Sequence, residues 1–335
     1  MKLKMFTLSG FARDHSWITL TVVGISVVWI LRKLAAHLRV FGLHRKAVFL
    51  TSADGGYGRE IALQCATYGM VVYAGCLSEE SRRSLEAAAR LFKGRLKALE
   101  FDITSEESIA AAVRFVREDL PPNTKLWAVL NTNEQHAHSS ADGRRSTEDF
   151  KALMELNYCA GVRLTHAFLP MIKASQGRVG VLSGVSEHLL LPFGANLAGA
   201  HKMALGSYIQ FIAGELQHFR IKFAVFEPGV STSALLCEEA IRERVEQTWS
   251  TMSPEKRREL GDEYKVKLLN HWNTVLDVHG RANSKNVVKA AVHFITSRSP
   301  RSHYNCGPSL ALETAYLMLL NFFSGIKSSI KRKQL

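Results

Sequence analysis

The stretch Ala47-Val-Phe-Leu-Thr-Ser-Ala-Asp-Gly-Gly-Tyr-Gly58 decides the fold, because it leads from an apolar β-type segment through a glycine-rich turn into a helical pattern. A turn between a strand and the following helix presents free backbone N–H groups and the positive end of the helix dipole, and both attract phosphate. A glycine cluster after a strand can also be a simple tight turn. The position of this turn in the first strand–helix unit favours the phosphate-binding interpretation.

Downstream of this turn, short apolar strands alternate with longer helical patterns. This alternation predicts right-handed crossovers and a parallel sheet covered by helices on both faces, and unbroken apolar strands fit such burial. The sequence therefore predicts an α/β fold with a doubly wound parallel sheet (a Rossmann fold), whose ligands bind beyond the carboxyl ends of the strands. The expected strands are 47–51, 70–74, 96–101, 127–131, 178–183 and 221–226, and the expected helices are 57–67, 79–92, 105–120, 147–173 and 197–219.

Several motifs, in order, resemble the short-chain dehydrogenase/reductase family over roughly residues 46–310. The turn Thr51–Gly58 matches the spacing of the family's T-G-x-x-x-G-x-G motif. Further matches are Asp102 to the adenine-contacting Asp, Asn131 to the N-N-A-G motif, Asn157 to the water-anchoring Asn, 177–184 to the strand that carries the catalytic Ser, and Pro228-Gly229 to the P-G motif.

The resemblance implies a role for each matching residue. Asn157, Ser183 and Lys202 would be catalytic, and no metal site is implied. The cofactor-binding residues would be Thr51, Asp54, Gly56, Tyr57, Gly58, Asp102, Asn131, Lys202, Pro228 and Gly229. Simpler alternatives remain open, since Asp102 could cap the next helix, Asn157 could be a buried helix residue and Lys202 could be solvated.

The sequence departs from the family pattern where the chemistry should lie. The family's acid/base catalyst is the Tyr of a Tyr-x-x-x-Lys pair, and Ala198 stands four residues before Lys202. Ser52 replaces the first glycine of the turn, and Asn133-Glu134 replace a small Ala-Gly pair. Gly184 occupies the place of the catalytic Ser, which leaves Ser183 or Ser186 to reach the site.

Loss of the phenol should largely silence the family reaction, because positioned acid/base catalysis contributes about 10²–10⁴-fold. His201 and Tyr158 are weak substitutes, since a structural His is the simpler interpretation and Tyr158 should point away from Asn157. Two hypotheses follow: an NAD(P)-dependent oxidoreductase with impaired or altered activity, and a non-catalytic protein that keeps the fold to bind a dinucleotide, lipid or partner.

Finer features are similar to the hydroxysteroid, retinol and 3-hydroxybutyrate dehydrogenase branch, namely 74–77, 126–130 and 248–265. This resemblance implies a lipophilic alcohol or ketone as substrate, a lid over 231–278, and a dimer or tetramer formed through the long helices. We expect NAD as cofactor, with NADP not excluded, because no basic residue lies in the turn Thr51–Gly58 and Cys76-Leu77-Ser78 are uncharged. Arg82 and Arg83 follow shortly after these residues.

The termini carry most of the net charge of +13. Residues 1–46 hold eight Lys/Arg and one Asp, and residues 327–335 hold four Lys/Arg, so the remainder is near neutrality at +2. No nucleic-acid motif accompanies the charge, and basic ends that flank apolar segments indicate a membrane surface instead. The five cysteines are widely spaced without a C-x-x-C motif, so they predict neither a disulfide framework nor a zinc site.

The N-terminal region divides into a tail, 1–15, and an expected uncleaved membrane anchor, 16–38, around the charge-free run Trp17–Leu31. Excess positive charge after this run predicts a cytosolic body. Residues 311–335 form an apolar and then basic tail, in which Lys331 and Lys333 have the spacing of a dilysine endoplasmic-reticulum retrieval signal. We therefore expect the endoplasmic reticulum membrane. The alternatives are an interfacial helix or a mitochondrial presequence, with the mitochondrial inner membrane as location.

Overall fold

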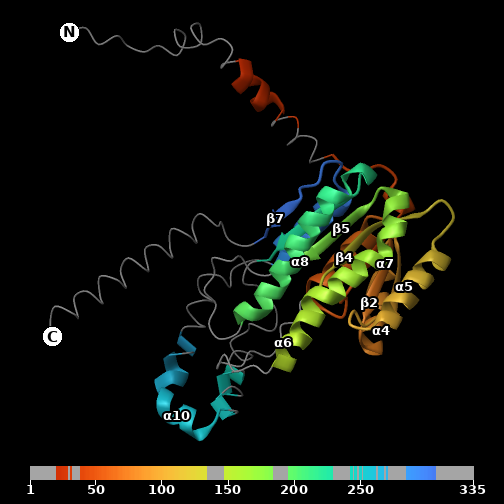
Figure 1. The fold of residues 1–335 in the computed structure, drawn as a ribbon. Helices are drawn as coiled ribbons and strands as arrows, with labels where there is room; N and C mark the ends of the chain where they lie inside the picture. Colours follow the sequence, from red (N-terminus) through yellow and green to blue (C-terminus); the bar gives the residue numbers. More distant parts are fainter. Residues whose placement is uncertain are drawn as a thin grey trace, which may run out of the picture. The chain divides into compact units, whose positions relative to one another are not determined.

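The structure is a computed structural model. It describes residues 20–28, 31, 38–133, 147–183, 195–228, 242–243, 245–246, 249–250, 252–261, 263–267, 269–270 and 284–306. The chain forms two compact units, one from 1–41 and 296–300 and the other from 42–295 and 301–335. The second unit holds the sheet and its helices (Figure 1).

A seven-stranded sheet lies at the centre of the second unit, in the order β3-β2-β1-β4-β5-β6-β7. Every strand pair is parallel, so the doubly wound sheet that the sequence predicts is confirmed. The strands are β1 (Lys46–Leu50), β2 (Val71–Cys76), β3 (Arg95–Glu100), β4 (Lys125–Asn131), β5 (Arg178–Leu182), β6 (Lys222–Glu227) and β7 (His303–Asn305).

Strand order reverses direction beside β1, which pairs with β2 on one side and with β4 on the other. Leu50 at the end of β1 faces Ala74 and Leu130 in these neighbours. Between β1 and β4 the crossovers leave in opposite directions, and in doubly wound sheets ligands bind beyond the carboxyl ends of the strands at such a point. The turn after β1 and the residues after β4 therefore meet at one place.

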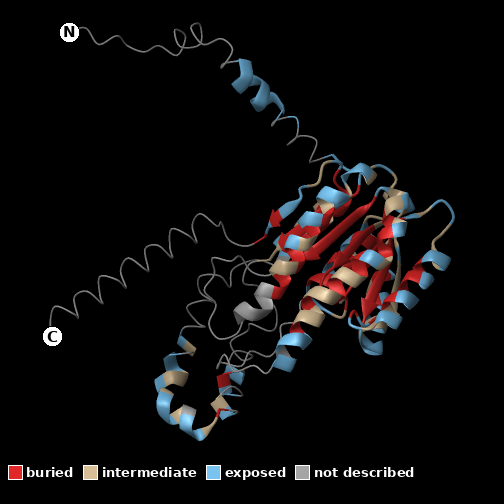
Figure 2. Ribbon diagram, viewed as in Figure 1, coloured by how far each residue is buried: buried red, intermediate tan, exposed pale blue. Residues whose placement is uncertain are grey.

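Helices cover both faces of the sheet, because alternate strand residues point to opposite sides. On one face Phe49 packs with its ring centroid 4.5 Å from that of Phe168. On the other face Phe226 lies 5.6 Å from Phe294. Figure 2 shows the inner strands largely buried between these layers, whereas the edge strand β3 has no fully buried residue. The helices are η1 (Leu43–Arg45), α3 (Gly56–Thr67), α4 (Glu79–Ala89), α5 (Glu106–Asp119), α6 (Thr147–Met154), the π-helical η2 (Glu155–Cys159), α7 (Ala160–Ser175), α8 (Ala195–Glu215), η3 (Gln217–Phe219), α10 (Pro254–Leu260) and α12 (Ser284–Thr296).

Two features differ from the sequence-based expectation. The helix expected over 147–173 is interrupted by the π-helical turn η2, which separates α6 from α7. The short strand β7 was not predicted, and it extends the sheet beyond β6 through pairs such as Phe226 with Tyr304. Three residues are too few to show the period-two pattern by which strands are recognised.

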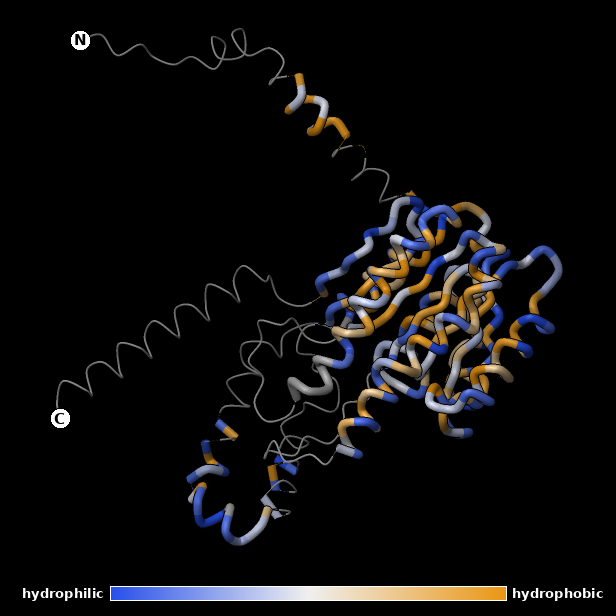
Figure 3. Tube along the Cα trace, viewed as in Figure 1, coloured by the Kyte–Doolittle hydropathy of each residue, from blue (hydrophilic) through white to orange (hydrophobic). Residues whose placement is uncertain are grey.

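The first unit contains a short apolar helical segment, 20–28, within the expected anchor (Figure 3). Its large side chains are exposed, with Leu20 at 72% and Ile25 at 65% of their full surface. Within the described ranges no helix has both the length and the apolar character required to cross a bilayer. Most of the flanking residues of 16–38 lie outside those ranges, so the anchor stays a prediction.

Candidate functional site

The glycine-rich turn after β1 adopts the tight path that its residues allow. Ser52 has φ of 50° and Gly56 has φ of 51°, both in the left-handed region. Glycine adopts this region freely, whereas a residue with a Cβ pays about 1 kcal/mol. The serine therefore holds a conformation for which glycine is better suited, and its occurrence there is a local strain.

Gly58 lies where the first turn of α3 approaches the glycine-rich turn most closely. A Cβ built on Gly58 would stand 2.3 Å from the backbone oxygen of Ser52 and 3.0 Å from the Thr132 hydroxyl oxygen. The first of these distances is impossible without moving backbone. Only glycine lets α3 start this close to β1 and β4.

The amino terminus of α3 has no side-chain N-cap, in contrast to those of α4 and α5. Its N-cap residue, Gly55, provides no side-chain hydrogen bond, and no acidic residue lies in the first turn. Ser78 and Ser105 cap α4 and α5, and each of these helices carries two glutamates in its first turn. A helix of 12 residues with uncapped N–H groups and no repelling carboxylate in its first turn suits a diphosphate.

A buried hydrogen-bond network joins the ends of β1 and β4. The Thr51 hydroxyl donates to Oδ1 of Asn131 at 3.1 Å and accepts from the Thr132 backbone N–H at 2.9 Å. Asn131 Oδ1 also accepts from the Asn133 N–H at 3.1 Å. Thr132 in turn donates its hydroxyl to the Thr51 carbonyl. Thr51 and Asn131 thus join the carboxyl ends of the two strands.

Lys202 on α8 is buried, with only 6% of its surface exposed, and its side chain contacts this network. Its ammonium donates to the backbone oxygen of Asn133 at 3.1 Å, and a buried ammonium requires such acceptors. The Ser183 hydroxyl, also buried, donates to the Lys202 carbonyl at 3.3 Å. Lys202 is therefore held at the carboxyl end of β4 and is not a solvated lysine. Ser183 supports α8, and its role toward a substrate stays a prediction.

Asn157 lies in the middle of the π-helical turn η2 and is buried. Its amide nitrogen donates to the Leu153 carbonyl at 3.2 Å, while its Oδ1 has no hydrogen-bond partner. Single π-turns inside α-helices occur frequently at functional sites. Four residues on, a Cβ at Gly161 would meet Asn131 Nδ2 at 3.0 Å, so this helix packs against the end of β4.

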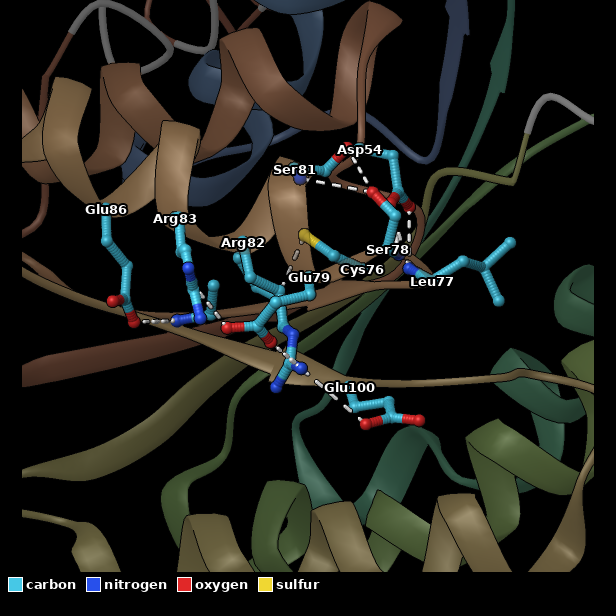
Figure 4. Close-up of polar contacts among 12 residues, drawn as sticks. Asp54, Cys76, Leu77, Ser78, Glu79, Ser81, Arg82, Arg83, Glu86 and Glu100 are labelled. Atoms are coloured by element: carbon cyan, nitrogen blue, oxygen red, sulfur yellow. Dashed lines mark hydrogen bonds and ion pairs between the residues drawn. The ribbon is translucent and has the colours of Figure 1, made fainter.

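Asp54 ties the glycine-rich turn to the turn after β2 (Figure 4). Its carboxylate accepts backbone hydrogen bonds from Leu77 at 2.9 and 3.0 Å and from Ser78 at 3.1 Å. The two arginines that follow are paired with acids: Arg83 with Glu79 at 2.8 Å, and Arg82 with Glu79 and, at 3.6 Å, with Glu100. This end of β2 is therefore lined by carboxylates.

The remaining predicted cofactor residues are distributed around the same edge. Asp102 follows β3 and accepts at Oδ1 from the Thr104 N–H at 2.8 Å and hydroxyl at 2.7 Å. The residue that caps the next helix, α5, is Ser105, so the capping alternative for Asp102 is wrong. Asp102 instead closes the turn before α5 and remains exposed at the sheet edge. Tyr57 is buried beside Gly58, and Pro228 directly follows β6. Gly229, Glu134, Gly184 and Ser186 lie outside the described residues.

The two substitute catalysts have other contacts. The His201 ring is 3% exposed and packs edge-on against Phe150, with centroids 4.8 Å apart. Tyr158 packs edge-on against Tyr208, whose hydroxyl lies 2.8 Å from His166 Nε2. Tyr158 therefore packs against Tyr208 on α8.

Sequence reasoning missed Thr132 and the backbone partners of Asp54. The family motif has no hydroxyl at the position of Thr132, so the motif gives no reason to select this residue. In the structure Thr132 completes the hydrogen-bond network around Thr51. Nothing in the sequence indicated that Asp54 would bind the turn after β2, because the two are joined only through strand pairing. Among the described side chains, no cluster of His, Cys, Asp and Glu could hold a metal ion.

Comparisons with known proteins agree with this geometry. The sequence profile of the short chain dehydrogenase family matches residues 46–244. The chain is 29% identical over 263 residues to 3beta-hydroxysteroid dehydrogenase dhs-16 of Caenorhabditis elegans, which covers 77% of this chain and 68% of that relative. It is 29% identical over 294 residues to retinol dehydrogenase 16 of Mus musculus, with 86% and 89% covered.

Solved structures show the same fold. NAD⁺-bound xylitol dehydrogenase superposes with a TM-score of 0.65 at 15% identity, covering 80% of this chain and 99% of that chain. At this level of identity the likeness concerns the arrangement of strands and helices, and the residues of the site must carry any functional conclusion.

Proposed function

Because this chain belongs to the short chain dehydrogenase family, we propose that it binds a nicotinamide dinucleotide at the turn Thr51–Gly58 and acts with much reduced turnover on a lipophilic alcohol or ketone. The observation that carries the proposal is the start of α3, which has no side-chain N-cap and follows a turn that approaches it so closely that position 58 has no space for a side chain. A diphosphate laid across this turn would meet the N–H groups of a helix whose N-cap residue provides no side-chain hydrogen bond and whose first turn holds no carboxylate.

The chain's own residues fit such a cofactor. The nicotinamide, when bound, supplies the hydride acceptor or donor. Lys202 holds a positive charge at the end of β4, where a ribose hydroxyl would accept a hydrogen bond from its ammonium. Asn157 contributes a buried carbonyl oxygen that has no partner and would hold a water in a proton relay. Thr51 and Asn131 hold the carboxyl ends of β1 and β4 together.

We favour NAD over NADP. A 2′-phosphate near the end of β2 would approach Asp54, Glu79 and Glu100, whose carboxylates would repel it. The guanidinium groups of Arg82 and Arg83 are already paired with Glu79. A ribose diol requires acceptors rather than cations, so this turn suits the unphosphorylated ribose.

The substrate class comes from the relatives, which are named for 3beta-hydroxysteroids and for retinol. Both are alcohols on large apolar skeletons. We propose the same class here, with the lid over 231–278 covering the apolar part of the substrate. Within the lid, Trp249 and Tyr264 stack with their ring centroids 6.3 Å apart, which provides an aromatic surface.

The proposed loss of turnover follows from position 198. Oxidation of an alcohol requires removal of its proton as the hydride leaves, and in α8 an alanine stands four residues before Lys202 where the family places its phenol. A non-catalytic protein that binds NAD and an apolar ligand is the second candidate. The same alanine favours it, together with the packing of His201 against Phe150 and of Tyr158 against Tyr208.

We place the protein in the endoplasmic reticulum membrane with a cytosolic body. The supporting observations are the charge-free run Trp17–Leu31, the Lys/Arg excess after it, and the spacing of Lys331 and Lys333. Protease added to intact microsomes should then digest the body. Full protection would indicate a luminal body, and recovery of the protein in mitochondria would refute the assignment.

Calorimetry and turnover test the function together. NADH should bind clearly more tightly than NADPH, and a panel of steroids, retinol and 3-hydroxybutyrate should show turnover far below that of the named relatives. Tighter binding of NADPH would overturn the cofactor assignment. Absence of binding by both dinucleotides would reject the proposed function as a whole.

A further inference from the structure

The strands of the sheet begin with cations at the edge opposite the candidate site. Five of the seven strands start with Lys or Arg: Lys46, Arg95, Lys125, Arg178 and Lys222. The strand pairing places four of these residues in two adjacent pairs, Lys46 with Lys125 and Arg178 with Lys222. Arg95 lies two strands from Lys46 and pairs with Val71. We call this row, with the connections that lead into β1–β6, the amino edge.

Those connections add further positive charge and no negative charge. They are 42–45, 68–70, 90–94, 120–124, 176–177 and 216–221, and none of them contains Asp or Glu. They contribute Arg45, Arg90, Lys93 and Arg220. The amino edge therefore carries nine Lys/Arg, whereas residues 45–326, to which all nine belong, have a net charge of only +4 (+13 less +5 for residues 1–44 and +4 for 327–335). Asp54, Asp102 and Glu79 lie at the opposite edge.

Among the residues that the structure describes, part of this charge is paired with acids and part is not. Asp119, the last residue of α5, pairs with Arg95 at 2.7 Å and with Lys97. Lys125 and Lys222 are exposed and form no ion pair with any residue that the structure describes. The pKa of Lys46 is lowered by burial and then by the charges of Arg178 and Lys125, so the cations of the row repel one another.

Two members of the row have structural roles. Arg178 is buried, donates to the Phe294 carbonyl at the end of α12, and lies 4.6 Å from the centroid of the Trp127 ring. The Lys46 ammonium lies 3.4 Å from the same centroid. The negative end of α12 and the face of Trp127 thus hold these two cations in place, and the exposed Lys125 and Lys222 continue the row toward solvent.

The course of the chain indicates what the amino edge faces. The chain enters β1 at this edge, and only ten residues, 32–41, separate Leu31, the end of the charge-free run, from Gly42. Ten extended residues reach at most about 35 Å. If a bilayer holds the apolar segment, this short covalent connection raises the effective concentration of its surface near the start of β1.

We propose that the amino edge binds the anionic surface of the membrane in which the N-terminal segment is inserted. The inference rests on the proposed N-terminal anchor and goes beyond it, because it assigns one face of the body to the lipid headgroups. Cations near an anionic leaflet strengthen binding roughly fivefold each at physiological salt. The candidate site, at the carboxyl ends of the strands, then lies on the side of the sheet away from the headgroups.

Photo-crosslinking of the full chain in vesicles tests this assignment. A photoreactive residue replaces Leu91, which lies in the connection before β3 and is 89% exposed, or Leu77, which lies after β2 and is 55% exposed. The vesicles contain phosphatidylcholine alone or with about one third phosphatidylserine. Lipid labelling from position 91 should rise severalfold with phosphatidylserine and fall with added salt, whereas labelling from position 77 should stay low.

Matched charge variants complete the experiment. Lys125→Glu with Lys222→Glu should abolish the phosphatidylserine effect, while Arg114→Glu with Lys289→Glu, the same charge change on exposed helix positions, should retain it. If lipid labelling from position 91 does not depend on phosphatidylserine, in protein that resists alkaline extraction, the proposed binding of the amino edge to lipid is refuted and the anchor is not. Release by alkali would refute the anchor and this inference with it. Protection of position 91 by added RNA but not by phosphatidylserine would identify a nucleic-acid surface instead.

Discussion

Replacement of Gly58 by alanine is the most local perturbation of the proposed cofactor site. The added Cβ would stand 2.3 Å from the Ser52 carbonyl oxygen and 2.9 Å from its carbon. Both are backbone atoms, so relief requires α3 to move by about 1 Å away from β1. Overpacking of this kind costs roughly 1–3 kcal/mol, which for a domain of this size lowers the midpoint of thermal unfolding by about 2–10 °C.

The same displacement withdraws the amino terminus of α3 from the diphosphate, so Gly58→Ala should also weaken NADH binding at least tenfold. Gly55→Ala is the matched control, because it lies in the same turn, has φ of −167° and has nothing within 4 Å of its Cβ position. Thermal unfolding and NADH titration of both variants provide the comparison. If Gly58→Ala matches Gly55→Ala in midpoint and in NADH affinity, the account of the turn is wrong.

Three further predictions concern neighbouring groups. Ser52→Gly should raise the free energy of unfolding by up to about 1 kcal/mol, measured by urea denaturation, because φ of 50° suits glycine; an unchanged value would argue against strain there. Glu79→Gln should remove the carboxylate that pairs with both Arg82 and Arg83, and so lower the preference for NADH over NADPH measured by calorimetry. An unaltered ratio of the two affinities would show that this carboxylate does not select the cofactor. Burial raises the pKa of the Cys65 and Cys76 thiols to about 12. Both thiols should therefore resist alkylation by iodoacetamide at pH 8 until the protein unfolds. Rapid labelling of these cysteines in the native protein, detected by mass spectrometry, would contradict their burial.

Much of the fold could be predicted because burial leaves a direct trace in the sequence. The runs that became β1, β4 and β5 are apolar without alternation, as strands covered on both faces must be. Capping serines mark the starts of α4 and α5. The π-helical turn at Asn157 could not be predicted, because one extra residue in a helix shifts its pattern by less than the scatter of apolar positions.

The candidate site was predictable in its members but not in their partners. The spacing of the turn and the position of Lys202 located the residues along the chain. That Thr51 bonds to Asn131, or that Asp54 bonds to Leu77, depends on which strands become neighbours. Sequence separations of 80 and 23 residues in these two pairs leave no local signal.

The most direct test of the central claim is the turnover of Ala198→Tyr compared with the natural chain, followed as NADH formation with steroid and retinoid alcohols. The account predicts that the phenol, four residues before Lys202 on α8, returns about 10²–10⁴-fold in rate. Lys202→Ala should remove this gain. Substantial turnover by the natural chain that is lost in His201→Ala and unchanged in Lys202→Ala would contradict the account, because another group would then be the catalyst.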